Sequence, residues 1–309
     1  MRDVVVIGGG LSGLAAACEL EKHNIKYTMI EVKRRLGGSI DSVQKGGFTF
    51  DSGPMCHAIT DSVFFNNYLA QIGLHDATFP VDDGKIAFKD GTAALVDALS
   101  SKVTAPVMRR MAVSTLGYME DEKRFAICME NGMVLDAGAL IIASPARYAE
   151  RMLYTLVPQA GFKLLDYAYD SVARISLGYT ADFPMTAKQD DTITAIQKIE
   201  HQSRTPDDGV IMQATVRFEP AAAIPEDIID NVIEITGWPS KYNAVHISHW
   251  AESDPVMYLD ENHVGNINEI HDMLPDGVEL IGSDYIATNS SPTIDQRIQQ
   301  GIAAARHGV

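Results

Sequence analysis

Three glycines near the N-terminus have the spacing of a phosphate-binding turn. Gly8, Gly10 and Gly13 form a G-x-G-x-x-G pattern, and the acidic residue Glu31 follows the last glycine 18 residues later. The first glycine permits a tight turn, the second lets a pyrophosphate approach the backbone, and the third lets a helix pack closely on a strand. An acid at this distance accepts hydrogen bonds from ribose hydroxyls, and its charge disfavours a 2′-phosphate. The pattern therefore predicts a site for an adenine dinucleotide without that phosphate.

The residues around these glycines predict the elements that such a site needs. Val4–Ile7 is a short β-branched run, typical of a strand buried on both faces of a parallel sheet. The next apolar residues recur at helical spacing and predict a helix that ends near His23: Leu11, Leu14, Ala15 and Cys18. Ile25–Ile30 predicts a second strand that closes on Glu31. The glycines thus lie between a strand and a helix whose N-terminal N–H groups favour a phosphate.

Composition narrows the class of protein. The chain has 309 residues, 46% of them hydrophobic and 21% charged, as in a well-folded enzyme of one large or two modest domains. Its formal charge of −16 disfavours nucleic acid as a partner. The three cysteines form no C-x-x-C pair and the histidines show no H-E-x-x-H spacing, so we expect neither disulfides nor a metal site.

The sequence gives no sign of a targeting or membrane segment. It enters the first apolar run without a basic leader, and the apolar stretch from Val4 to Leu20 is interrupted by the glycines. Elsewhere we find no run of about 18 uncharged apolar residues, the length that a membrane helix requires. We therefore expect a cytoplasmic protein with no integral membrane segment.

Two further segments extend the glycine pattern. Residues 35–38 match R-x-G-G, and residues 50–53 match F-D-x-G. With these segments the chain resembles the FAD-dependent amine oxidase superfamily, which includes monoamine oxidases, protoporphyrinogen oxidases, phytoene desaturases and renalase. Its length is closer to renalase-like and other compact members. The resemblance implies an oxidoreductase that binds FAD non-covalently, since no cysteine lies near the C-terminal flavin segment.

The resemblance also implies roles for single residues. Arg35 would supply a cation to the diphosphate, while Ser39 stands where the family usually has a basic residue, which we expect to weaken binding without abolishing it. Asp284 would hold the ribityl chain or a hydroxyl on the diphosphate side. Thr293 and Ile294, at the start of the last helix, would point N–H groups at the N1–C2=O edge of the flavin, which favours the anionic reduced form.

The expected cofactor-binding residues come from the glycine turn, the segments that extend it, one strand near the adenine and the C-terminal residues 275–309. They are Gly8, Gly10, Leu11, Ser12, Gly13, Glu31, Val32, Arg35, Gly37, Gly38, Ser39, Gly53, Pro54, Met55, Val107, Ser283, Asp284, Thr293 and Ile294. The chain departs from the family pattern at Gln296-Arg297, where Gly-Ala is usual. An Arg297 that faced the ring would favour the reduced flavin further, and one that faced solvent would have no effect.

We expect an α/β fold with two domains. The Rossmann-like FAD-binding domain is discontinuous and covers residues 1–57, 92–150 and 275–309. Residues 58–91 and 151–274 remain for a smaller α+β substrate domain. In it, Pro225, Glu226 and Asp227 are expected to form the first turn of a short helix, and alternation predicts a strand at Ser171–Tyr179. Thr192–Glu200 and Val210–Arg217 are predicted as further strands, and His246–Trp250 resembles a strand, followed by a turn, of porphyrinogen-oxidase-like proteins. Together these segments indicate an antiparallel or mixed sheet. So small a domain favours a homo-oligomer, in which a second subunit covers an exposed apolar face.

The predicted reaction is hydride transfer from a small-molecule donor to flavin N5. The donor is expected to be a small amine, a dihydropyridine or porphyrinogen-like, with oxygen or another acceptor taking the electrons. His57 is a weak catalytic candidate, because a loop histidine more often serves packing. His57 and Tyr179 are candidates to line one face of the ring, and Trp250 is either a packing residue or a substrate wall. Four lysines carry no motif, and none is chosen: Lys163, Lys188, Lys198 and Lys241.

Two alternatives of other classes stay open. A shortened substrate domain is compatible with a flavin-binding protein without turnover, which would act as a partner or sensor. The glycine pattern alone is also compatible with an NAD-dependent oxidoreductase. The R-x-G-G and F-D-x-G extensions argue against NAD, because they belong to the FAD-binding pattern of the family that the chain resembles.

Overall fold

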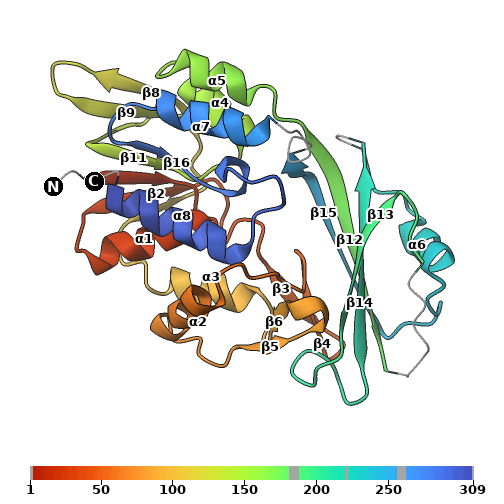
Figure 1. Ribbon diagram of the computed structural model, residues 1–309. Helices are drawn as coiled ribbons and strands as arrows, with labels where there is room; N and C mark the ends of the chain where they lie inside the picture. The colour runs from red at the N-terminus through yellow and green to blue at the C-terminus, as the bar shows by residue number, and fades with distance from the viewer. Residues whose placement is uncertain (1–2, 181–187, 220–221, 256–261, 308–309) are drawn as a thin grey trace.

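A computed structural model describes residues 3–180, 188–219, 222–255 and 262–307 of the chain. These residues form two lobes (Figure 1). The first lobe is built on a five-stranded parallel sheet, and the second on a four-stranded antiparallel sheet. This arrangement confirms the predicted α/β class with a Rossmann-like part and a smaller second part.

The parallel sheet forms the centre of the first lobe. Its strands, in the order β16-β11-β1-β2-β7, are Val278–Leu280, Ala139–Ile142, Val4–Ile7, Tyr27–Glu31 and Val107–Arg109. The predicted first strand is confirmed at both ends, and the second starts at Tyr27 rather than Ile25 and ends on Glu31 as expected. Strand β1 is paired with β11 on one side and β2 on the other, which explains its continuous apolar sequence.

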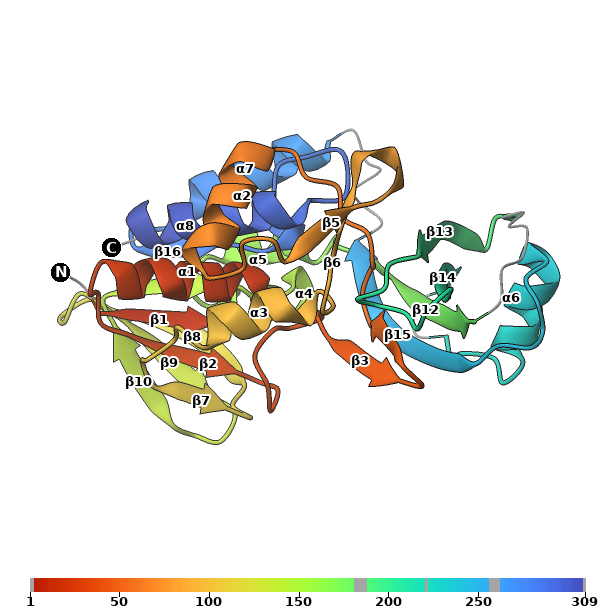
Figure 2. The ribbon, with the colours of Figure 1, turned by 90° about the horizontal axis from the view of Figure 1, so that it is seen from below.

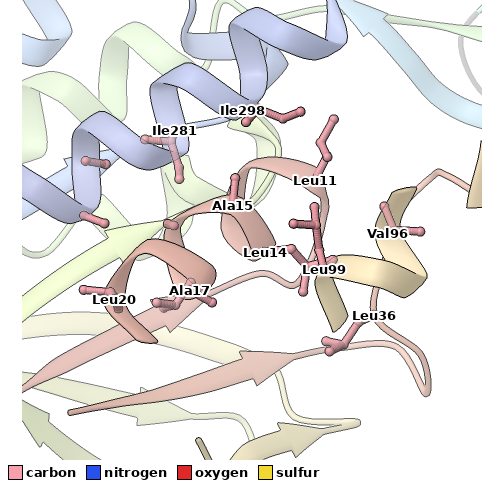
Figure 3. Packing of buried hydrophobic residues seen from close by; sticks show 14 of the residues in the cluster. Leu11, Leu14, Ala15, Ala17, Leu20, Leu36, Val96, Leu99, Ile281 and Ile298 are labelled. Carbon is pink, nitrogen blue, oxygen red and sulfur yellow. The ribbon is translucent and has the colours of Figure 1, made fainter. Parts of the chain in front are cut away.

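Four helices pack in the hydrophobic cluster on one face of this sheet. They are α1 (Leu11–Lys22), α2 (Ser62–Gln71), α3 (Ala93–Ser100) and α8 (Ile294–His307). Figure 3 shows Leu14 of α1 close to Leu99 of α3, and Ile298 of α8 belongs to the same cluster. The helix predicted after the glycine turn is therefore confirmed, and it ends next to His23 as expected.

A second set of elements covers the opposite face of the parallel sheet. It contains a three-stranded antiparallel sheet and three helices: β8 (Val113–Met119), β9 (Arg124–Met129), β10 (Val134–Ala137), α4 (Ala146–Leu153), α5 (Pro158–Leu164) and α7 (His263–Met273). Val5 and Ile7 of β1 pack in this cluster, whereas Val4 and Val6 pack against α1. In the described part of the chain, we find no helix with the length and apolar character needed to cross a membrane.

The second lobe lies beside the first (Figure 2). Its strands, in the order β13-β14-β12-β15, are Ile193–Ile199, Val210–Phe218, Tyr169–Tyr179 and Ala244–Pro255. Every pair in this sheet is antiparallel, so the antiparallel alternative holds. The expected turn after Trp250 is instead a continuation of β15, because the strand still pairs with the start of β12 at Tyr169 and Asp170.

The two faces of the antiparallel sheet differ in chemistry. Ile175 and Leu177 of β12 pack with helix α6 (Ile228–Thr236), the predicted short helix, which begins at Ile228 rather than at Pro225. The alternate residues of β12, Arg174 and Ser176, belong to the other face, because side chains alternate along a strand. The second lobe therefore has one apolar face under α6 and an opposite face, here called the polar face, where polar side chains lie beside the apolar Ile199 and Ile211.

Two hairpins connect the lobes. They consist of β3 (Ser42–Lys45) with β4 (Phe48–Asp51) and of β5 (Thr78–Pro80) with β6 (Ile86–Phe88). Phe48 and Phe79 pack with Ile211 of the antiparallel sheet. Helix α2, by contrast, contributes to the core of the first lobe through residues such as Phe65. The segment 58–91, which we expected in the substrate domain, is therefore divided between the two lobes.

Candidate functional site

The glycine turn has the geometry that close packing of strand and helix requires. Gly8 has a φ of +107°, and a Cβ atom there would lie 2.4 Å from the carbonyl oxygen of Ala143. A Cβ atom on Gly13 would lie 2.0 Å from the carbonyl oxygen of Gly8. Both positions exclude a side chain, so these glycines serve the turn and the helix–strand contact, as predicted from their spacing.

Gly10 differs from the other two glycines because it borders open space. A Cβ atom there would meet only the Cα of Gly38, at 3.9 Å. Helix α1 begins at Leu11 without a side-chain cap and without an acidic residue in its first turn. The N–H groups of Leu11 and Ser12 thus remain for an anion at the positive end of the helix dipole.

The second glycine pair lies directly against the first. The N–H of Gly37 donates a hydrogen bond of 2.7 Å to the carbonyl oxygen of Gly9. Gly38 has a φ of +62°, and a Cβ atom there would be 3.0 Å from the Cα of Gly10. The R-x-G-G segment and the helix N-terminus thus form one cradle, here called the glycine cradle, made of Gly9, Gly10, Gly37 and Gly38.

Arg35 shapes the segment that carries this cradle. Its guanidinium donates to the carbonyl oxygens of Leu36, Gly38 and Ile40, at 3.2, 3.4 and 2.8 Å, and lies 3.5 Å from the carboxylate of Asp41. The cation predicted for the diphosphate is therefore held on its own loop. Ser39 is exposed at the same loop, where the family usually has a basic residue.

Glu31 lies at the carboxyl end of β2, beside the glycine turn. Its side chain is buried, and its two oxygens accept hydrogen bonds of 2.7 Å from the N–H groups of Gly9 and Lys33. The neighbouring Val32 is 62% exposed. Val107, on the edge strand β7, pairs with Met29, two residues before Glu31 on β2, and Glu31 itself pairs with Arg109. The structure thus brings together the acid, Val32 and the edge strand that we expected near the adenosine.

The F-D-x-G loop, residues 51–56, lies between the lobes. A Cβ atom on Gly53 would meet nothing within 4 Å, and Pro54 is exposed, so this part of the loop borders open space. Met55 is fully buried, and its N–H donates to Oε1 of Gln197 at 2.7 Å. Of the three loop residues expected at the cofactor, Met55 thus points its side chain into the core.

Asp51 is the centre of a buried polar network. Its carboxylate accepts from the N–H and hydroxyl of Thr92, at 2.8 and 3.0 Å, from the hydroxyl of Ser42 at 2.5 Å and from Arg204 at 3.0 Å. Arg204 is completely buried and also donates to the carbonyl oxygens of Thr49 and Phe88. The sequence did not indicate Arg204 or Thr92, because neither carries a motif.

His57 belongs to the same network. Its Nε2 lies 3.0 Å from the hydroxyl of Thr92, which in turn donates to Asp51. Burial lowers the pKa of the His57 imidazole to about 4, so the ring is neutral at pH 7. A neutral, buried histidine with a hydroxyl partner fits the packing role that we weighed against catalysis.

The C-terminal segment, residues 275–309, places Asp284 near the end of β11. One oxygen of its buried carboxylate accepts from the N–H of Ala146 at 2.9 Å and from the hydroxyl of Tyr169 at 2.5 Å. The hydroxyl of Ser283 lies 3.2 Å from the other oxygen. Ser144, at the carboxyl end of β11, has a buried hydroxyl that finds no hydrogen-bond partner among the described residues.

The start of α8 is fixed by its own side chains. The N–H of Thr293 donates to Oε1 of Gln296 at 3.0 Å, which is one of the two hydrogen bonds of a capping box. The buried carboxylate of Asp295 accepts from the hydroxyl of Thr293 and from the N–H groups of Thr60 and Asp61. Burial alone would raise the pKa of Asp295, but these hydrogen bonds outweigh it and hold the pKa below its usual value. Ile294, expected at the flavin, is fully buried beside them.

The remaining candidates from the sequence are Tyr179, Trp250 and the lysines without a motif. Tyr179 packs in the cluster under α6, with its hydroxyl on the carbonyl oxygen of Pro239, so our expectation that it lines the ring is wrong. Trp250 lies on the opposite face and donates to the carbonyl oxygen of Ser52 at 3.1 Å. Lys163 and Lys198 form ion pairs with glutamates, and no metal-binding cluster of histidine, cysteine or acidic residues occurs in the described chain.

These features fit a large polar cofactor with a diphosphate. The open sides of Gly10 and Gly53 leave room at the helix N-terminus and at the loop between the lobes. Two fully buried oxygens near these positions lack a hydrogen-bond partner in the described residues, the hydroxyl of Ser144 and Oε1 of Gln213. A buried polar atom without a partner is costly, so such atoms favour a bound group that can pair with them.

Comparison of the sequence with known families supports the first part of this site. The sequence profile of NAD(P)-binding Rossmann-like domains matches residues 6–71. A carotenoid 3,4-desaturase of Haloarcula japonica is 34% identical over 95 residues, 29% of this chain and 19% of the relative. The mitochondrial protoporphyrinogen oxidase of Nicotiana tabacum is 34% identical over 98 residues, 31% of this chain and 19% of the relative. The matches thus span about a fifth of these relatives.

Solved structures match the fold over nearly the whole chain. The crystal structure of a candidate protoporphyrinogen oxidase from Exiguobacterium sp. 255-15 superposes with a TM-score of 0.81 at 13% identity, and covers 99% of this chain and 98% of the other. A putrescine oxidase bound to putrescine superposes with a TM-score of 0.74 at 13% identity and the same coverage. Residues 6–71 of this chain thus resemble NAD(P)-binding Rossmann-like domains, and the relatives that match part of the chain include a desaturase and a protoporphyrinogen oxidase.

Proposed function

We propose that the protein is an FAD-dependent oxidoreductase. The observation that carries the proposal is the glycine cradle, in which Gly38 lies against Gly10 beside the uncapped start of α1. The two glycine segments together leave room for a diphosphate, which is longer than the single phosphate that one helix N-terminus binds. The names of the homologues, a desaturase and a protoporphyrinogen oxidase, agree with redox chemistry.

Different residues of the site would bind different parts of FAD. The N–H groups of Leu11 and Ser12 would bind the diphosphate, and the carboxylate of Glu31 would accept hydrogen bonds from the adenosine ribose. Gly53 would let the loop between the lobes approach the ring. The chemistry that bound FAD would supply is hydride acceptance at N5 from the donor and transfer of the electrons to an acceptor. The two lobes would exclude water from the ring while this happens.

The donor that we propose is a small molecule of the amine, dihydropyridine or porphyrinogen-like type, with oxygen or another acceptor. The fold match with a putrescine oxidase and a candidate protoporphyrinogen oxidase supports this range. We also propose a cytoplasmic location, because three free cysteines suit a reducing compartment. We also propose that the protein forms a homo-oligomer.

The absorption spectrum of the purified protein tests the cofactor. We expect a two-band flavin spectrum and release of FAD on heating. Gly10→Val should lower FAD affinity at least tenfold, because its side chain would enter the open space of the cradle. Gly117→Val is the matched control, since a Cβ atom there meets nothing within 4 Å and the residue lies on β8, away from the cradle.

Other outcomes would replace the proposal. A colourless protein that binds NAD but not added FAD would favour the NAD-dependent alternative. A yellow protein whose flavin no amine, dihydropyridine or porphyrinogen bleaches under anaerobic conditions would favour a flavin-binding partner or sensor. Retention of wild-type FAD affinity by Gly10→Val would show that the dinucleotide does not lie in the glycine cradle.

A further inference from the structure

The backbone of the F-D-x-G loop is held by side chains of the second lobe. Gln213, on β14, donates from Nε2 to the carbonyl oxygens of Asp51 and Gly53, at 3.2 and 3.1 Å. Gln197, on β13, accepts from the N–H groups of Met55 and Cys56, at 2.7 and 3.2 Å, and donates back to the carbonyl oxygen of Cys56 at 3.1 Å. Two carboxamides thus bind five of the loop's backbone groups.

A third strand completes this set of contacts. The hydroxyl of Ser248 and the indole N–H of Trp250, both on β15, donate to the carbonyl oxygen of Ser52 at 2.5 and 3.1 Å. The imidazole of His246 lies 3.1 Å from the hydroxyl of Ser52. The loop is therefore attached to three strands of one sheet, although no strand of that sheet pairs with it.

The two glutamines occupy one face of the sheet by register. Gln197 pairs with Gln213, and Gln213 pairs with Ser176 of β12, so all three side chains share the polar face. Gln213 is completely buried, and its Nε2 also lies 3.1 Å from the hydroxyl of Ser176. A buried carboxamide whose two N–H groups are shared among three oxygens is held in one orientation, and it holds the loop carbonyls in turn.

We propose that Gln213 and Gln197 are positioning residues, through which the antiparallel sheet sets the backbone of the F-D-x-G loop against the flavin. The proposal rests on the proposed function for the identity of the cofactor. Neither glutamine need touch the ring: each acts through the loop, whose open side is at Gly53. The second lobe would then tune the cofactor as well as cover the donor.

Hydrogen exchange of the apoprotein tests the attachment without FAD. In Gln197→Leu, the amides of Met55 and Cys56 lose their acceptor, so peptides that contain residues 51–57 should exchange at least tenfold faster. Gln213→Leu should act on the same peptides, because the Asp51 and Gly53 carbonyls lose their donor. Gln71→Leu, at the exposed end of α2, is the matched control and should leave them unchanged. Wild-type exchange rates in both loop variants would overturn the proposal.

The flavin itself tests the consequence. We expect Gln213→Leu to bind FAD about tenfold more weakly. We also expect a changed visible spectrum and a shifted midpoint potential in dithionite titration. A purely structural role would lower the melting temperature and leave the spectrum and potential of the bound flavin as in the wild type, which would overturn the positioning role. Wild-type protein that takes up no FAD would refute the proposed function, and the exchange experiment would still decide whether the sheet holds the loop.

Discussion

At the scale of single residues, the site depends on backbone groups more than on charged side chains. The cradle offers N–H groups and space, and its nearest arginine, Arg35, is held by three carbonyl oxygens of its own loop. The acidic residues are similarly engaged: Glu31 accepts from two N–H groups and Asp295 from Thr60, Asp61 and Thr293. Charged side chains here shape the loops that a cofactor would meet.

His57 gives a prediction about stability and pH. Its pKa is lowered by burial to about 4 in the folded state, against 6.5 for an ordinary histidine. Below pH 6.5 the unfolded chain therefore binds a proton that the folded chain does not, and stability falls until about pH 4. The loss should be on the order of 3 kcal/mol. Above pH 6.5 the imidazole is neutral in both the folded and the unfolded chain, so its titration no longer lowers stability.

Urea unfolding of the wild type and of His57→Gln between pH 4 and 7 measures this contribution. We expect the variant to lose much less stability over that range, because glutamine does not titrate. His75→Gln is the control, because His75 also lies in a loop but is exposed, whereas His57 is buried. Equal pH dependence in the wild type and His57→Gln would show that His57 is not the titrating group. Unchanged donor oxidation in His57→Gln would separately remove it as a catalytic candidate.

At the scale of elements, short segments from distant parts of the chain meet at Arg204. This residue follows β13, and its guanidinium contacts the end of β4 through Asp51, the strand itself through Thr49, and β6 through Phe88. The backbone carbonyl oxygen of Arg204 also accepts a hydrogen bond from the N–H of Thr49. One buried side chain therefore joins the β4 and β6 strands of the two connecting hairpins to the antiparallel sheet.

Removal of this guanidinium should be strongly destabilising. Arg204→Met leaves the Asp51 carboxylate buried beside Thr92 without its cation, which costs about 3–5 kcal/mol. Arg217→Met is a matched control: Arg217 pairs with Asp170 at 2.7 Å, but its side chain is 36% exposed, so the cost should stay below about 1 kcal/mol. Denaturant unfolding of both variants measures the difference. Equal losses would show that burial of the Arg204–Asp51 pair adds nothing.

At the scale of the whole molecule, the two lobes share one buried polar seam. The seam contains the Arg204–Asp51 pair and the contacts of Gln197 and Gln213 with the F-D-x-G loop. An apolar cluster around Phe48, Phe79 and Ile211 lies next to it. Lobes joined in this way are expected to unfold together, because neither can lose its structure without exposing the other's partners.

Calorimetry of the apoprotein should therefore show a single cooperative transition. In Gln213→Leu the seam loses its donors to the loop carbonyls, so the transition should broaden or divide into two. Gln71→Leu, at the exposed end of α2, should keep the single transition. Two separate transitions in the wild-type protein would contradict the coupling of the lobes through this seam.

Local sequence determined the first strand and the first helix of the first lobe and the shape of the glycine turn between them. Val4–Ile7 and the helix that begins at Leu11 follow from periodicity, and the structure reproduces their bounds. The clash of a Cβ atom on Gly13 with Gly8 is also local in origin, because strand, turn and helix are consecutive. The resemblance supplied the expected family, and partial matches with a desaturase and a protoporphyrinogen oxidase agree with that expectation.

Only the tertiary structure decided which distant residues meet. Arg204, Gln197 and Gln213 carry no motif, and alternation along a strand gives the face of a side chain but not the segment that covers it. The division of residues 58–91 between the lobes and the place of Tyr179 under α6 depend on the same packing. Periodicity reports which residues are buried, whereas contacts between segments far apart depend on how all elements pack at once.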